Sequence, residues 1–388
     1  MSKAFAAAAL VSGSRAGLVS FDDFLEAHGR AYEAGTDEYV MRRGLYEERL
    51  AGAERHNAQE GRLWTAGVNK LWDWTDAELE TLRGWDGSKV PGGAGGLRSV
   101  QPHRSAFLQQ RGADLPKEKV WGELAMAQRI KNQQNCGSCW AIAVSSVLEA
   151  HAQIYTGKVR TFSAQQIVEC TPNPRHCGGD GGCQGATAEL GMEWVLKNGC
   201  AEESEVPYTG QDAACQGGSA TADMARALVA GGGTSFLDGA DTAAMGGGAF
   251  GMTGWETLPK NQYEPLARAL AEKGPVAVSV AADTWFNYES GIFNGCGKDA
   301  VIDHAVTAIG YGEQDGHKYW LIQNSWGADW GEGGHIRLER HDQDTYCGMN
   351  NDPQKGVACQ GETDPVPVCG MCGVLFDSVV PHFGGGGQ

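Results

Sequence analysis

The stretch Gln133-Gln134-Asn135-Cys136-Gly137-Ser138-Cys139-Trp140 stands directly before a long helical pattern. That pattern covers residues 140–155, where Ala, Val, Ile and Leu dominate, and Gly157 is suited to end the helix. Cys139 is then expected at the N-terminus of a buried helix, where the positive end of the peptide dipoles favours a thiolate over a thiol. The stretch therefore predicts a nucleophilic cysteine.

A cysteine nucleophile needs an imidazole that takes and returns a proton, and a third group that orients the ring. The second half of the chain offers His304 in Asp303-His304-Ala305 and Asn324 in Gln323-Asn324-Ser325-Trp326-Gly327. Short β-rich runs lie around them, at 276–281, 305–311, 319–324 and 334–339. Further helical patterns come before these runs, at 187–197 and 263–272. Helices followed by strands favour an α+β fold over a doubly wound sheet.

Charge and composition exclude two classes of partner. The 388 residues carry 31 Lys and Arg against 48 Asp and Glu, whereas a nucleic-acid binder needs a basic surface. The excess acid lies downstream, because residues 1–113 hold 14 basic and 15 acidic side chains while residues 114–388 hold 17 and 33. No apolar run reaches the roughly 18 residues of a membrane-spanning helix. We expect neither a nucleic-acid partner nor a membrane span.

The 12 cysteines lack a zinc pattern, since Cys369-x-x-Cys372 supplies only two of the usual four ligands. We therefore expect disulfides, an oxidising compartment, and no metal or other cofactor. Lys3, the apolar residues 4–11 and the small residues that follow are typical of a short secretory signal over residues 1–16. A plain disordered N-terminus is the alternative.

The motif around Cys139 resembles the C-G-[SA]-C-[WY] signature of the papain-like cysteine peptidases, cathepsin L-like branch. The resemblance implies a papain-like α+β fold with a helical lobe, a β-barrel-like lobe and an active-site cleft between them. It implies a thiol endopeptidase with Cys139 as nucleophile and His304 as acid and base. Asn324 would orient the ring, and Gln133 would help form the oxyanion hole. His304 follows Cys139 by 165 residues, more than the roughly 130–150 of the signature, and the Gly-rich stretch 216–251 supplies the insertion.

Two upstream motifs resemble the inhibitory propeptide of the same branch. An interspersed helical motif is matched at Glu38, Arg42, Tyr46 and Asn57, with departures at Arg49 and Ala53. Residues 67–73 resemble the second motif, with Leu71 where Phe is usual. The implied domains are a helical inhibitory propeptide at 21–82, a linker with the activation cleavage region at 83–114, and a catalytic domain at 115–388 with insertions at about 216–251 and 347–370. An ordinary amphipathic helical hairpin at 21–82 is the alternative.

The resemblance also pairs cysteines. The implied pairs are Cys136 with Cys183 and Cys170 with Cys215. Cys296 needs a partner near the C-terminus, where Cys347 and Cys372 compete. We prefer Cys372, because Pro381 stands nine residues beyond it, as the family's terminal strand requires. An odd number of cysteines then remains, so at least one is unpaired or pairs between chains: Cys177, Cys200, Cys347, Cys359 and Cys369.

The choice of Cys372 also implies the position of a substrate pocket. The resemblance places Asp377 at the bottom of the pocket for the second side chain before the scissile bond. Small or apolar walls would suit Leu, Val or Phe, and the carboxylate can bind an Arg guanidinium. The walls and other substrate contacts are Thr187, Ala188, Ile302, Ala305, Gly185 and Trp326. The alternative is that Asp377 faces solvent.

Two other functions share these residues: an inactive papain-fold binding protein, and an acyl transferase that uses the same triad. An exopeptidase is disfavoured because residues 200–208 are too short for the cleft-blocking loop of the cathepsin B-like branch. We expect protein and peptide substrates, cystatin-like inhibitors, a monomer, and a lysosomal, vacuolar or secreted location. Acid would release the propeptide if carboxylates of the catalytic part contact its arginines, namely Arg42, Arg43, Arg49 and Arg55.

Overall fold

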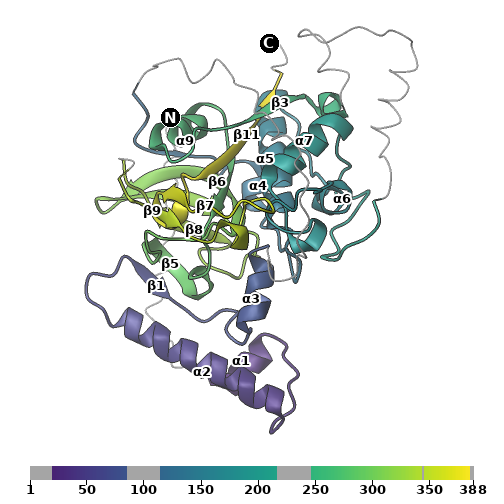
Figure 1. Cartoon of the computed structure of the whole chain (residues 1–388). Helices are drawn as coiled ribbons and strands as arrows, with labels where there is room; N and C mark the ends of the chain where they lie inside the picture. Colours follow the sequence, from purple (N-terminus) through teal and green to yellow (C-terminus); the bar gives the residue numbers. More distant parts are fainter. Residues whose placement is uncertain (1–19, 85–113, 216–245, 343–344, 385–388) are drawn as a thin grey trace, which may run out of the picture.

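The computed structural model of the chain describes residues 20–84, 114–215, 246–342 and 345–384 (Figure 1). The predicted signal at 1–16, nearly all of the 83–114 linker and most of the 216–251 insertion lie outside the described residues. We call residues 20–84 the N-terminal unit and the described residues from 114 to 384 the C-terminal unit.

The N-terminal unit is helical and has a small core of its own. It contains α1 (Phe21–Ala27), α2 (Asp37–Asn57), β1 (Trp64–Ala66) and α3 (Asp76–Leu82). Each helix begins after a Ser or Thr whose side-chain oxygen accepts a backbone N–H of the first turn. The core buries the aromatic side chains Phe21, Phe24, Tyr46 and Trp72. In Figure 1 this unit is purple and meets the rest of the molecule through β1 and α3.

Helices form one lobe of the C-terminal unit (Figure 1). Its centre is α5 (Cys139–Thr156), which is buried at every residue from Cys139 to Ala152. The helix ends where Gly157 adopts a left-handed φ of 69°. Around it lie α4 (Ala125–Gln128), α6 (Ala164–Cys170), η3 (Gly182–Gln184) and α7 (Ala188–Asn198). The helices predicted at 140–155 and 187–197 are confirmed to within one residue at each end.

The other lobe is built on a sheet with strand order β1-β5-β8-β7-β6-β4-β11-β3, in which β2 also pairs with β6. The strands are β2 (Lys119–Val120), β3 (Met252–Thr257), β4 (Val276–Val280), β5 (Tyr288–Phe293), β6 (His304–Gln314), β7 (His317–Gln323), β8 (His335–Glu339) and β11 (Asp377–Phe383). The remaining helical elements of this part are α9 (Tyr263–Glu272), η6 (Trp285–Asn287) and η8 (Met371–Gly373), whereas η5 (Gly246–Phe250) packs against α7 of the helical lobe. The two-lobed α+β fold is confirmed, and β1 of the N-terminal unit extends the sheet by pairing antiparallel with β5.

The stretch 347–370 forms a small sheet of its own, made of β9 (Cys347–Asn350) and β10 (Val366–Cys369), with η7 (Pro353–Lys355) between them. Disulfides close it, Cys347–Cys369, and tie it to the helical lobe, Cys177–Cys359. The other bonds in the described residues join the cysteines that the resemblance pairs: Cys136–Cys183, Cys170–Cys215 and Cys296–Cys372. Of the described cysteines, Cys139 and Cys200 are free.

Candidate active site

Cys139 is the first residue of α5, and its free thiol is buried. Burial raises the pKa of this thiol to about 11, although hydrogen bonds from the backbone of Ala305 and Trp140 act in the opposite direction. The expectation of a thiolate is therefore wrong for this covered state of the protein. The cover is the end of the N-terminal unit, because a Cβ added to Gly84 would lie only 3.0 Å from the Cys139 Sγ.

His304 begins β6 and Asn324 directly follows β7, so the antiparallel pairing of these strands brings the two side chains together. His304 Nε2 lies 2.8 Å from Asn324 Oδ1. Burial lowers the pKa of His304 to about 4, so the ring is neutral and its Nε2–H donates to the amide oxygen. Its Nδ1 is buried and has no hydrogen-bond partner among the described residues. That nitrogen is therefore available to accept a proton.

Gln133 is fully buried before α5, and both ends of its amide are used. Its Oε1 accepts a hydrogen bond from Ser325 Oγ at 2.6 Å, which fixes the orientation of the amide. Its Nε2 donates to Cys136 O at 3.0 Å and to Leu82 O at 2.9 Å. Trp326 Nε1 also approaches Leu82 O, at 3.4 Å. A backbone carbonyl of the N-terminal unit thus occupies the donors that lie beside Cys139.

Trp326, two residues after Asn324, packs against the ring of His304. Its ring centroid lies 5.2 Å from that of His304, at an interplanar angle of 32°. Trp285 lies on the ring's edge in a T-shaped contact, with centroids 6.1 Å apart. The two indoles keep water from the His304–Asn324 hydrogen bond and strengthen it through the low local dielectric.

The backbone of the N-terminal unit crosses the cleft at a point where only glycine fits. A Cβ on Gly137 would lie 2.9 Å from the Gly84 Cα, and one on Gly185 would overlap the Gly84 carbonyl oxygen. Gly84 itself has a φ of +86°. The predicted substrate contact Gly185 therefore faces the peptide backbone of the chain's own N-terminal unit.

The carboxyl group of Asp377 lies at the start of β11, buried, and accepts a hydrogen bond from Ser279 Oγ at 2.8 Å. The alternative that Asp377 faces solvent is therefore wrong. A second carboxyl group, Glu189 on α7, lies against it. Burial, and then the charge of Asp377, raise the pKa of Glu189, whose Oε2 has no hydrogen-bond partner in the described part of the chain. Sequence reasoning missed Glu189, because nothing in a helical Glu signals that it points inward.

The other predicted pocket residues do not all lie together. Ala188 and Ala305 pack in the same apolar cluster as Cys139. Thr187 stands at the N-cap of α7, directly before Ala188. Ile302 packs instead with Val368 and Phe376, in a separate cluster next to the inserted strands.

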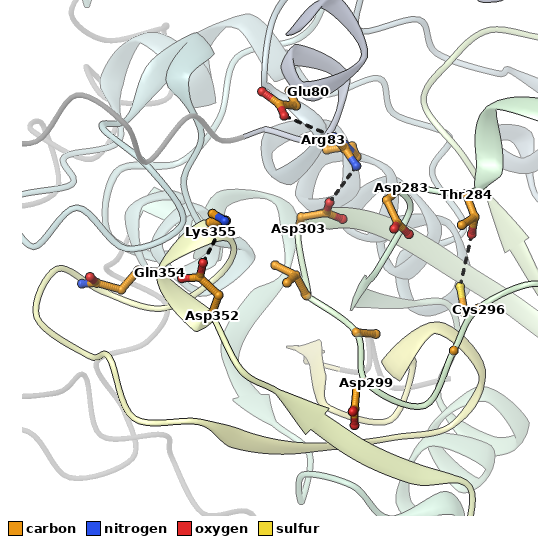
Figure 2. Close-up of a pocket in the computed structure, with 13 residues that line it drawn as sticks. Glu80, Arg83, Asp283, Thr284, Cys296, Asp299, Asp303, Asp352, Gln354 and Lys355 are labelled. Atoms are coloured by element: carbon orange, nitrogen blue, oxygen red, sulfur yellow. Dashed lines mark hydrogen bonds and ion pairs between the residues drawn. The ribbon is translucent and has the colours of Figure 1, made fainter. Parts of the chain in front are cut away.

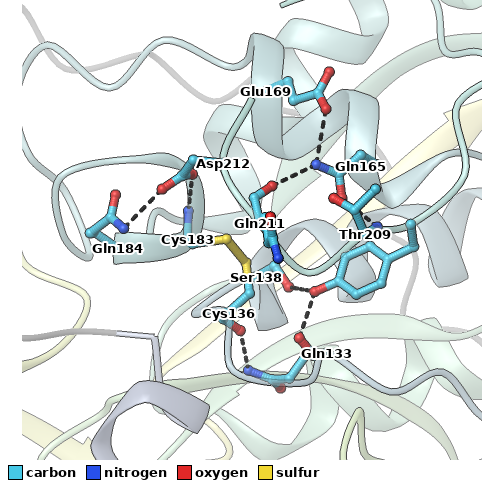
Figure 3. Close-up of a disulfide and its surroundings, with 12 residues drawn as sticks. Gln133, Cys136, Ser138, Gln165, Glu169, Cys183, Gln184, Thr209, Gln211 and Asp212 are labelled. Atoms are coloured by element: carbon cyan, nitrogen blue, oxygen red, sulfur yellow. Dashed lines mark hydrogen bonds between the residues drawn. A yellow bond between two sulfur atoms is a disulfide. The ribbon is translucent and has the colours of Figure 1, made fainter. Parts of the chain in front are cut away.

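Tyr208 is a second residue that sequence reasoning missed. Its hydroxyl donates to Gln133 O at 2.7 Å and shares a hydrogen bond with Ser138 Oγ at 2.5 Å. It thereby ties together both ends of the loop that carries the amide and the thiol. Figure 3 shows Gln133 and Ser138 of this loop beside the Cys136–Cys183 disulfide. No local pattern reveals this contact, because Tyr208 lies 75 residues from Gln133 along the chain.

The expected contacts between propeptide arginines and catalytic carboxylates are wrong. These arginines pair inside the N-terminal unit, Arg42 with Glu78 and Glu38, Arg43 with Glu47, and Arg49 with Asp76, and Arg55 makes no ion pair with a described residue. Ion pairs between the two units are made by other cations. Lys70 Nζ lies 2.8 Å from Asp329, and Arg83 Nη1 lies 3.4 Å from Asp303.

Comparison with known proteins agrees with this geometry. Residues 115–357 match the model of the papain family of cysteine proteases, and residues 21–79 match a cathepsin propeptide inhibitor domain. This chain belongs to the papain family of cysteine proteases. A senescence-specific cysteine protease from Arabidopsis thaliana is 32% identical, over 84% of this chain and 86% of the relative. Cathepsin S from Bos taurus is 29% identical, over 86% and 90%. The structure of a recombinant stem bromelain precursor is similar with a TM-score of 0.65 and 26% identity, over 94% and 97%.

The protein is thus a cysteine endopeptidase with a propeptide inhibitor domain, and that domain is the N-terminal unit that lies across Cys139. Within the described ranges, no helix is both long and apolar enough to cross a membrane. The described residues also contain no group of three or more His, Cys, Asp or Glu side chains placed to hold a metal ion.

Proposed function

We propose that this papain-family protease is a zymogen that hydrolyses peptide bonds with Cys139, His304 and Asn324, assisted by Gln133. The observation that carries the proposal is the Leu82 carbonyl, a peptide carbonyl that accepts hydrogen bonds from Gln133 Nε2 at 2.9 Å and from Trp326 Nε1 at 3.4 Å. A cleft that binds the backbone of the N-terminal unit in this way is suited to bind the backbone of a substrate.

Removal of the N-terminal unit exposes the thiol, and its pKa falls because burial no longer disfavours the charged form. The thiol then gives its proton to His304 Nδ1, and the sulfur attacks the carbonyl carbon of the substrate. Gln133 Nε2, freed from Leu82, donates to the oxyanion together with a backbone N–H at the start of α5.

The second half of the reaction returns the proton. His304 gives it to the leaving amine as the tetrahedral intermediate collapses to a thioester. Water then loses a proton to His304 and attacks the thioester, which releases the carboxylic acid and restores the thiol. Asn324 holds the ring in one orientation throughout, through the bond from Nε2–H.

The rival functions make different predictions. An inactive binding protein is disfavoured, because the nucleophile, the imidazole and the amides are all present. An acyl transferase would pass the acyl group to an amine rather than to water. Product analysis with a peptide ester and an added amino-acid amide separates the two, since hydrolysis yields the acid and transfer yields the amide.

The test of the proposed function is hydrolysis of a fluorogenic peptide after the N-terminal unit has been removed. We expect Cys139→Ala to abolish turnover. Cys200→Ala is the matched control, because Cys200 is the other free buried thiol and lies in the same lobe. Retained turnover in purified Cys139→Ala protein would overturn the mechanism.

The structure also supports proposals about substrate preference and cellular location. The buried pair of Asp377 and Glu189 favours an Arg guanidinium at the second residue before the scissile bond, while Ala188 and Ala305 favour Leu, Val or Phe there. The disulfides favour a lysosomal, vacuolar or secreted location. We also propose that the enzyme is a monomer and that cystatin-like proteins inhibit it.

A further inference from the structure

A second pocket lies beside the cleft, between Glu80 and Arg83 of the N-terminal unit and loops of the C-terminal unit (Figure 2). It has a volume of about 650 Å³, and its charged walls come from loops of three origins. Asp283 follows β4, and Asp299 and Asp303 belong to the connection from β5 to β6. Asp352 comes from the inserted stretch 347–370, next to η7.

In the zymogen, the N-terminal unit contributes a cation to the wall of this pocket. Arg83 of the N-terminal unit extends into it, and its Nη1 lies 3.4 Å from Asp303 Oδ2 (Figure 2). The Asp303 side chain is only 11% exposed, and its other oxygen accepts the backbone N–H of Ala282 at 3.0 Å. One oxygen of Asp303 is therefore held by the protein, and the second is directed at the guanidinium.

The walls stay in place when Arg83 leaves, because they are tied to the C-terminal unit. Asp299 Oδ1 accepts the backbone N–H of Met349 at 2.8 Å, which joins the β5–β6 connection to β9. Asp352 pairs with Lys355 at 3.0 Å. Once Arg83 is removed, Asp283, Asp299 and Asp352 face a single lysine, so the pocket keeps an excess of negative charge. Burial raises the pKa of Asp303 to about 7, so Asp303 adds its own charge above that pH and beside a bound cation.

We propose that in the mature enzyme this acidic pocket binds the Arg or Lys side chain of the substrate residue immediately after the scissile bond. The inference rests on the proposed function. We assign the pocket to the residue after the scissile bond because His304 must reach the leaving amine, which belongs to that residue. The pocket carboxylate Asp303 is next to His304 in the chain. The basic character of the bound side chain is inferred from Arg83, whose guanidinium faces Asp303 in the zymogen. Arg83 directly precedes Gly84, the glycine that covers the Cys139 sulfur.

The test uses mature enzyme and two peptides that differ only in the residue after the cleaved bond, Arg in one and Gln in the other, at a pH above the raised pKa of Asp303, which is about 7. We expect wild type to cleave the Arg peptide with at least about tenfold higher kcat/KM, since charge-assisted hydrogen bonds exceed neutral ones by this order. Asp303→Asn should lower the Arg:Gln ratio by about tenfold. The ratio cancels any loss of catalysis that both peptides share.

A second variant keeps the proposal testable if Asp303→Asn does not fold. The double variant Asp283→Asn and Asp352→Asn changes only the rim, and should also lower the ratio severalfold. Asp364→Asn, an exposed aspartate of the same inserted stretch outside the pocket, should leave it unchanged. A ratio near one in wild type, or a ratio that none of the pocket variants changes, overturns the inference. If wild type cleaves neither these peptides nor any other, the proposed function itself has failed.

Discussion

Replacing Gly84 by Ala is expected to uncover the active site of the zymogen. Gly84 has a φ of +86°, and a left-handed conformation costs an L-residue about 1–2 kcal/mol. The new Cβ would also lie 3.0 Å from the Cys139 Sγ and 3.5 Å from the Gly137 carbonyl oxygen, which adds about 1 kcal/mol of overpacking. A total of about 2–3 kcal/mol raises the population with an open cleft about 30- to 150-fold.

The assay is the rate at which iodoacetamide alkylates Cys139 in the intact zymogen at neutral pH. Intact-mass spectrometry restricts the count to full-length protein, so prior cleavage does not contribute. Gly61→Ala is the matched control, because Gly61 has a φ of +73° in the same unit but no atom within 4 Å of the added Cβ. If Gly84→Ala zymogen is alkylated no faster than the Gly61→Ala zymogen, Gly84 does not cover the thiol and the reasoning is refuted.

The remaining predictions concern the oxyanion, the substrate and pH. Gln133→Ala should lower kcat by about 10²–10³. The affinity for an unreactive substrate-like peptide, which forms no oxyanion, should change little. An unchanged kcat would remove Gln133 from the mechanism. Asp377→Ala should lower the ratio of kcat/KM for Arg over Leu at the second residue before the scissile bond, whereas Glu189→Gln should change it little near neutral pH, because the raised pKa keeps Glu189 protonated. A ratio that Asp377→Ala leaves unchanged would show that the pocket lies elsewhere. Hydrogen bonds from Arg42 lower the pKa of Glu78 to about 2, so this carboxylate stabilises the N-terminal unit above its usual pKa of 4.5, and the stabilisation is lost as pH falls from 4.5 towards 2. Tryptophan fluorescence of the Cys139→Ala zymogen should report a loosened N-terminal unit in that window, and Glu78→Gln should shift the transition to higher pH; identical transitions would contradict the assignment.

Local patterns were sufficient for the elements that the core holds. The central helix was predicted within a residue of α5, because a long run of small and branched apolar residues ends at Gly157, where the left-handed φ suits glycine. The β-rich runs at 305–311 and 319–324 overlap β6, which begins at His304, and β7, which Asn324 directly follows. The positions of these residues therefore followed from sequence.

Features that depend on contact between distant segments could not be predicted. The thiol of Cys139 was expected to ionise, because the helix N-terminus is visible in the sequence, while burial beneath Gly84 is not. The arginines of the N-terminal unit were given partners in the C-terminal unit, whereas Arg42 reaches Glu78 on α3 of its own unit. The contact of Glu189 with Asp377 is not visible in the sequence, because it depends on how α7 packs beside β11.

In the proposed mechanism Cys139 is the nucleophile, and in the zymogen the N-terminal unit covers it. The most direct measurement is peptide mapping of iodoacetamide-treated protein before and after removal of that unit, with hydrolysis assayed in the same samples. We expect little labelling and no hydrolysis before removal, and afterwards one label per chain on Cys139 with a matching loss of activity. Full labelling of Cys139 with activity retained, or loss of activity on labelling of Cys200 alone, would contradict it.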